Sequence, residues 1–161
     1  MGAQQAAEAA AWIAERYQPA RVVSSPYHRA RQTAGIIAAH LGLDVTVEPD
    51  LREQSYGDLA GRPYGSVREC ADYDPASYWR WCPPGGETLD AVAARAGAVL
   101  DRLAKSLPDG DLVVVSHGGV MMALWRHVTG AWRQGRVARN AGIMVVDHDG
   151  ARYAGVTAIE D

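Results

Sequence analysis

The stretch that decides the fold is Asp111-Leu-Val-Val-Val-Ser-His-Gly-Gly119. Its four consecutive apolar residues predict a short strand that is buried on both faces, as in a parallel sheet. The spacing that follows, from Val120 to Val128, predicts a helix. His117 would then lie at the carboxyl end of a strand, where open α/β sheets bind ligands, and Gly118 and Gly119 would let a ligand approach the backbone. The alternative is a core histidine that only ends a strand.

Strands and helices alternate on both sides of this stretch. An apolar spacing of three to four residues predicts helices over 2–17, 28–41 and 87–106. Short β-branched runs predict strands at 21–25 and 45–48, and turn residues predict a C-terminal hairpin of 143–147 with 151–157. Together they indicate a single α/β domain over 1–161, a three-layer α/β/α sandwich with a mixed, mostly parallel sheet and a C-terminal antiparallel hairpin.

One long segment breaks the alternation. Residues 51–86 are rich in glycine, proline, tyrosine and tryptophan. Their apolar residues show neither the helical spacing of three to four residues nor the alternation of a strand. Irregular segments of this length in a compact domain often form a lid, so we expect 58–86 to be a lid or a pocket wall. A packed surface excursion is an equal alternative.

Composition narrows the classes of function. With 48% hydrophobic and 22% charged residues, the 161-residue chain is typical of a soluble globular protein. A net charge of −3 argues against nucleic acid and anionic membranes as partners. Cys70 and Cys82 form no C-x-x-C pair, so no metal site is expected, and no cofactor is predicted. Two thiols without a secretory signal favour a reducing, cytoplasmic location.

Three further polar residues fall near predicted strand ends. Arg29 lies in the first turn of a predicted helix, where N–H groups and the helix dipole favour an anion. Glu53 follows the predicted strand of 45–48 and could exchange a proton with substrate. His28 lies next to Arg29 and could line the same pocket. Taken singly, each is more typical of a solvated surface residue.

Two other chemistries lack their required motifs. A His-Gly-Gly loop also occurs in the oxyanion hole of lipase-like hydrolases, but that fold needs a G-x-S-x-G nucleophile, and none is present. Nucleotide binding would favour a P-loop or G-x-G-x-x-G, and neither occurs.

Considered together, the motifs resemble the histidine phosphatase superfamily, the phosphoglycerate-mutase-like fold. The resemblance covers the whole chain in the family's order. The matched segments are G-x-x-Q-A at Gly2 to Ala6, S-S-P-x-x-R-A-x-Q-T-A at Ser24 to Ala34, L-x-E-x-x-x-G at Leu51 to Gly57, P-x-G-G-E-T at Pro83 to Thr88, and S-H-G-G at Ser116 to Gly119.

The resemblance implies a phosphomonoester hydrolase that works through a phosphohistidine. It implies that Arg29 and His117 hold the phosphoryl oxygens, that the Gly118 N–H points into the site, and that Glu53 protonates the leaving oxygen. Tyr56 matches a substrate-contacting tyrosine, and His28 is a second candidate substrate contact. The expected ligand is inorganic phosphate or a small phosphorylated metabolite, and the aromatic lid favours a phosphatase over a mutase.

The chain departs from the family pattern at one place. The family carries its nucleophilic histidine in an R-H-G motif on a strand ahead of the G-x-x-Q-A helix, and this chain contains no R-H-G. We therefore expect the first strand of the family fold to be missing, through truncation of the sequence. Otherwise its place, between the strand of 112–115 and the hairpin, is filled by a partner strand or by closure of its neighbours. An unfilled place would favour a homo-oligomer.

Two hypotheses follow. The first is a histidine-type phosphatase that is inactive without its nucleophile strand. The second is a non-catalytic pseudoenzyme that binds a phosphoester or a partner.

Overall fold

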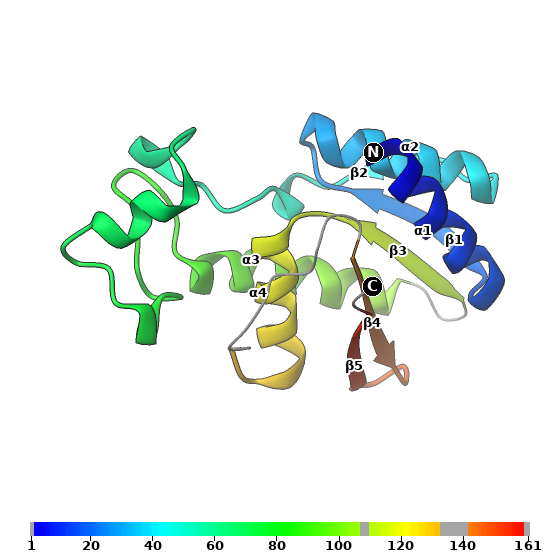
Figure 1. The fold of residues 1–161 in the computed structure, drawn as a ribbon. Coiled ribbons are helices and arrows are strands. Elements are labelled where there is room, and N and C mark those ends of the chain that lie inside the picture. Colours follow the sequence, from blue (N-terminus) through cyan, green and yellow to red (C-terminus); the bar gives the residue numbers. More distant parts are fainter. Residues whose placement is uncertain (1, 107–109, 133–141, 160–161) are drawn as a thin grey trace.

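The predicted alternation of strands and helices is present in the fold. The computed structural model describes residues 2–106, 110–132 and 142–159 (Figure 1). The elements are α1 (Gly2–Arg16), β1 (Pro19–Ser24), α2 (His28–Leu41), β2 (Val45–Val47), α3 (Leu89–Lys105), β3 (Asp111–Val115), α4 (Gly118–Thr129), β4 (Ile143–His148) and β5 (Tyr153–Ile159).

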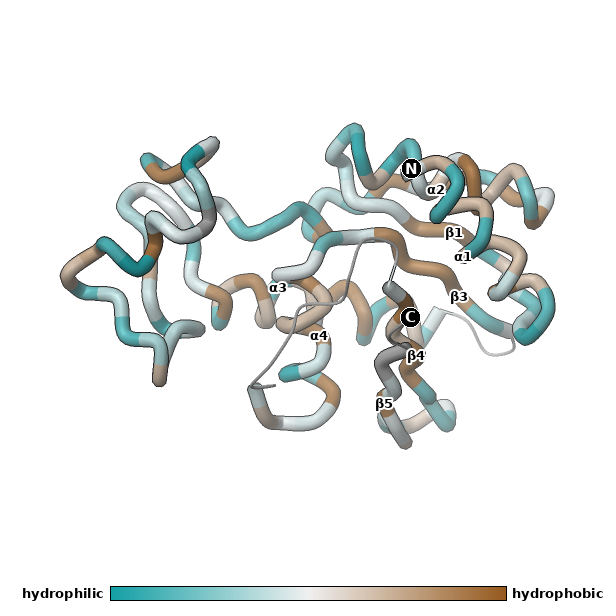
Figure 2. The backbone as a smooth tube through the Cα atoms, viewed as in Figure 1, coloured by the Kyte–Doolittle hydropathy of each residue, from teal (hydrophilic) through white to brown (hydrophobic). Residues whose placement is uncertain are grey.

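A parallel sheet with the order β2-β1-β3 lies at the centre. Because successive strand residues point to opposite faces, Val22 packs with α2 while Val23 joins the core formed by α3 and α4. Helices α1 and α2 cover one face and α3 and α4 the other (Figure 1). Figure 2 shows the hydrophobic run of β1 and β3 between these layers. The three-layer sandwich is confirmed.

Local signals explain where the helices begin and end. Helix α2 ends at Gly42, which adopts φ 69°, a left-handed conformation that favours glycine. Helix α3 begins at Leu89, two residues after the predicted start, because Thr88 is the N-cap and its Oγ accepts the Ala91 N–H at 3.0 Å. Helix α4 begins at Gly118, two residues before the predicted start, with the extended His117 before it.

The C-terminal hairpin stands apart from the parallel strands. β4 and β5 pair antiparallel, as predicted, but within the described residues neither strand pairs with β3. Side chains attach the hairpin to the helical layer, since the Asp101 carboxylate of α3 accepts from the Tyr153 hydroxyl and pairs with His127 of α4. The prediction that β3 is buried on both faces is wrong. Its residues are only half-buried, because several of them line a cavity that faces β4.

Residues 58–86 contain short 3-10 turns, which include η3 (Tyr64–Glu69) and η4 (Pro75–Ser77). The segment projects away from the sheet, at the left of Figure 1. Aromatic packing attaches this segment to the rest of the chain, since Trp79 stacks on Trp132 with ring centroids 6.0 Å apart. In the described part of the chain, none of the helices has the length and apolar character needed to cross a membrane.

Candidate active site

A cavity of about 1900 Å³ runs along β3 to its carboxyl end. One part lies between residues 112–115 of β3 and 143–146 of β4, and we call this part the β3/β4 groove. The other part contains five of the six residues that sequence reasoning selected, which are Arg29, Glu53, Tyr56, His117 and Gly118. The carboxyl ends of β1 and β3 place Arg29, His117 and Gly118 there, as parallel topology requires, and the segment after β2 adds Glu53 and Tyr56.

His117 is placed by the end of β3. The imidazole is only 7% exposed, and its Nε2 lies 2.7 Å from the Oγ of Ser25, at the end of β1. Burial, together with the positive charges of Arg29 and Arg95, lowers the pKa of His117 to about 4. The ring is therefore neutral near pH 7, and it can donate only one N–H to a ligand.

Arg29 occupies the first turn of α2, where it is exposed toward the cavity. Its guanidinium lies over the Tyr27 ring, 5.1 Å from the centroid, and the same tyrosine packs edge-on against the His117 ring at 5.2 Å. Tyr27 thus links the arginine to the histidine, although 39% of the tyrosine is exposed. A guanidinium in the first turn of a helix, beside exposed N–H groups, suits an anion such as phosphate.

The Glu53 carboxylate faces the N-terminus of α4. Its Oε2 accepts the Gly119 N–H at 3.4 Å, and its Oε1 accepts the Gln54 N–H at 2.9 Å. A Cβ on residue 119 would lie 2.5 Å from Oε1, so only glycine leaves room for this carboxylate. The sequence predicted that Gly119 admits a ligand. In the structure, its close neighbour is a side chain of the same chain.

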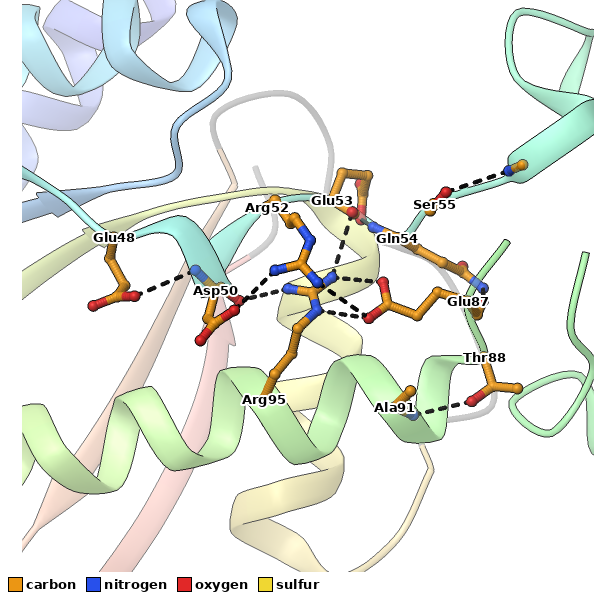
Figure 3. A network of polar contacts seen from close by, with 11 residues as sticks. Glu48, Asp50, Arg52, Glu53, Gln54, Ser55, Glu87, Thr88, Ala91 and Arg95 are labelled. Atoms are coloured by element: carbon orange, nitrogen blue, oxygen red, sulfur yellow. Dashed lines mark hydrogen bonds and ion pairs between the residues drawn. The ribbon is translucent and has the colours of Figure 1, made fainter. Parts of the chain in front are cut away.

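A polar network fixes the backbone that carries Glu53 (Figure 3). Arg95 of α3 donates to both carboxylate oxygens of Glu87 at 2.8 and 2.9 Å, and also to the backbone carbonyls of Asp50 and Glu53. The bonds from Arg95 hold the pKa of Glu87 below its usual value. The sequence motifs do not single out Arg95. Its spacing of three from Val92 and four from Val99 places it at the edge of the buried stripe of α3. This position is the feature of the sequence that could identify it as a partly buried arginine.

The remaining predicted residues differ in position. Gly118 is the first residue of α4, where a backbone N–H has no intrahelical partner. Tyr56 is half-buried and lines the cavity. His28 is exposed and does not line the cavity, and none of the described residues of 58–86 lines it either. The roles of His28 and of the lid stay predictions.

The chemistry of Arg29, His117 and the first N–H groups of α4 suits an anion, and the Glu53 carboxyl group lies beside these N–H groups. Among the residues that the structure describes, no three histidine, cysteine, aspartate or glutamate side chains are grouped to hold a metal ion.

Known proteins are similar to this chain in sequence and in fold. The family model described as histidine phosphatase superfamily (branch 1) matches residues 1–160. A metal-independent phosphoserine phosphatase of Arabidopsis thaliana is 32% identical over 91% of this chain and 63% of its own length. A glucosyl-3-phosphoglycerate phosphatase of Mycobacterium tuberculosis is 37% identical over 73% of this chain and 58% of its own length.

Solved structures agree with these relatives. A mycobacterial glucosyl-3-phosphoglycerate phosphatase in complex with VO3 superposes with a TM-score of 0.80 at 28% identity, over 97% of this chain and 82% of the other. The same enzyme was also solved with inorganic phosphate, and that structure has a TM-score of 0.75 at 27% identity over 98% of this chain and 83% of the other. The curated relatives are longer, since the matches cover from 33% to 65% of their lengths.

Proposed function

This chain belongs to the histidine phosphatase superfamily, and from that premise we propose that it is the substrate-binding and proton-donating part of a phosphomonoester hydrolase. The ligand is inorganic phosphate or a small phosphorylated metabolite. The observation that carries the proposal is the convergence of Arg29, His117 and Glu53 on one cavity at the carboxyl ends of β1 and β3.

Each group has a distinct role in the proposed reaction. Arg29 and an N–H of His117 bind the non-bridging phosphoryl oxygens, together with the Gly118 N–H, and so neutralise the charge that spreads over them during transfer. As the bond between phosphorus and the leaving oxygen breaks, Glu53 gives its proton to that oxygen. Tyr56 contacts the leaving group, and His28 contributes at most from outside the cavity.

None of the residues assigned above supplies the nucleophile. In the complete family member a histidine of an R-H-G motif accepts the phosphoryl group, which water then removes, and none of the five histidines of this chain is in such a motif. We place the nucleophile on a strand that occupies the β3/β4 groove. Support comes from the edge of β3 that faces β4, which has no strand partner among the described residues and opens into the same cavity as His117. The chain alone is expected to bind phosphate without turnover.

A pseudoenzyme is the second candidate, and the absent R-H-G motif favours it. In that case the site binds a phosphoester, and no strand that fills the groove restores hydrolysis. A groove filled by a second copy of the chain would appear as a homo-oligomer by size-exclusion chromatography.

Calorimetry with inorganic phosphate tests the binding site. Arg29→Ala and His117→Ala are expected to weaken phosphate binding roughly tenfold or more, because each removes a hydrogen bond to a charged group. Arg31→Ala, in the same helix turn but exposed, is the matched control. If neither Arg29→Ala nor His117→Ala alters the affinity, the assignment of the phosphate site is wrong.

Complementation tests the groove. A synthetic peptide with an L-x-R-H-G segment is added to the chain, and hydrolysis of p-nitrophenyl phosphate is followed, with a control peptide in which asparagine replaces the histidine. Turnover that occurs with the L-x-R-H-G peptide but not with the asparagine peptide supports the hydrolase. Phosphate binding without turnover under either condition supports the pseudoenzyme.

A further inference from the structure

We propose that Ser25 is a positioning residue that fixes the tautomer of His117, so that Nδ1 carries the ring proton and donates it to the bound anion. The inference rests on the proposed phosphate site. It assigns a role to a residue that sequence reasoning did not select and that does not itself line the cavity.

The sheet fixes the position of the serine. Ser25 is fully buried, and its N–H donates to the Val115 carbonyl at 2.9 Å, which extends the pairing of β1 with β3 by one residue. Its Oγ therefore stands at a fixed place beside the end of β3, and there it meets the Nε2 of His117 at 2.7 Å.

Counting hydrogens selects one tautomer. The Ser25 Oγ accepts the Tyr27 N–H at 3.3 Å, and its only other partner in the described chain is the Nε2 of His117. If Nε2 carried the proton, the buried hydroxyl would accept twice and its own hydrogen would have no acceptor, which is costly. If Nε2 is unprotonated, the hydroxyl donates to it and every group is satisfied. A neutral ring then holds its proton on Nδ1.

The other ring nitrogen is the one available to a ligand. Nδ1 of His117 has no hydrogen-bond partner among the described residues, yet it is not among the buried unpaired atoms, which are the indole nitrogens of Trp81 and Trp132. His117 lines the cavity beside Arg29. With Ser25 as donor, the ring offers an anion an N–H instead of a lone pair, which would repel it.

Nuclear magnetic resonance of the ¹⁵N-labelled chain tests the tautomer directly. Two-bond ¹H–¹⁵N correlations of the imidazole are expected to place the proton of His117 on Nδ1 in the wild-type chain. In Ser25→Ala the Nε2–H form should become populated. Ser24→Ala is the matched control, because that hydroxyl is equally buried but donates to the Ser25 carbonyl. A proton on Nε2 in the wild-type chain overturns the inference even if Ser25→Ala does not fold.

Phosphate affinity supplies the second measurement. Ser25→Ala is expected to weaken phosphate binding about tenfold, and Ser24→Ala to leave it within twofold. If His117→Ala weakens binding while Ser25→Ala changes neither the affinity nor the tautomer, this inference fails and the phosphate site stands. If His117→Ala has no effect on binding, the phosphate site fails, and a donor role for its Nδ1 fails with it.

Discussion

Removal of the Arg95 guanidinium is expected to destabilise the chain, and the structure sets the size of the effect. Arg95→Met keeps most of the aliphatic stem, which is in a side chain only 11% exposed, and it removes two bonds to Glu87 and one to each of two backbone carbonyls. Breaking a fully buried pair costs about 3–5 kcal/mol. Because Glu87 is 17% exposed and lies 3.8 Å from Arg52, we expect about 2–3 kcal/mol in the free energy of unfolding.

A double-mutant cycle measured by urea denaturation checks this magnitude. Arg95→Met, Glu87→Gln and the double variant are compared with the wild-type chain, and a coupling energy of about 1–2 kcal/mol is expected, since each single change leaves a partly buried group without its partner. Arg31→Met is the control on an exposed side chain and should change stability by less than about 0.5 kcal/mol. A cost below about 0.5 kcal/mol for Arg95→Met, or a coupling energy near zero, would refute the reasoning.

Three further changes test the site and its support. Gly119→Ala should displace the Glu53 carboxylate, but because that carboxylate ends a flexible side chain, the change should cost no more than about 1 kcal/mol of unfolding free energy. Gly35→Ala, which meets nothing within 4 Å, should be neutral or stabilising in the same thermal-denaturation assay. Since the folded pKa of His117 is about 4 and its ordinary value is 6.5, the unfolded chain binds the proton first. Protonation of this residue should therefore lower the free energy of unfolding by up to about 3 kcal/mol as pH falls from 6.5 to 4. Denaturation at each pH measures this loss, and NMR titration of the imidazole measures the pKa. An NMR-measured pKa above 6 would exclude the effect. Thr88→Ala should cost about 1 kcal/mol of stability through loss of the α3 cap, and an unchanged urea midpoint would contradict it.

The sequence predicted the convergence of the site because two local rules were sufficient. Residues just after parallel strands meet at one edge of the sheet, and this rule alone predicts that His117 lies near Arg29. Helix bounds followed from capping and periodicity to within two residues. The position of Glu53 after β2 is enough to select it as a site candidate, but the sequence does not predict its contact with α4.

What remained unpredicted depends on contacts between segments far apart in the chain. Ser25 meets His117 across 92 positions, and Arg95 meets the Glu53 carbonyl across 42. Periodicity assigns a residue to a face but does not name its partner on another element. For the same reason, the sequence could not show that β3 would be half-buried, because its apolar run is equally compatible with a strand that has neighbours on both sides.

The open edge of β3 also bears on how the chain behaves at high concentration. Three consecutive valines precede Ser116, and their backbone groups on the side facing β4 have no strand partner among the described residues. A hydrophobic edge without a strand partner is a template for strand addition from any chain, including misassembled copies. Because Asp101 attaches the hairpin to the helices, side chains and not sheet hydrogen bonds hold β4 at its distance from β3. The groove proposed to receive the nucleophile strand is therefore also a place where strand addition can lead to aggregation.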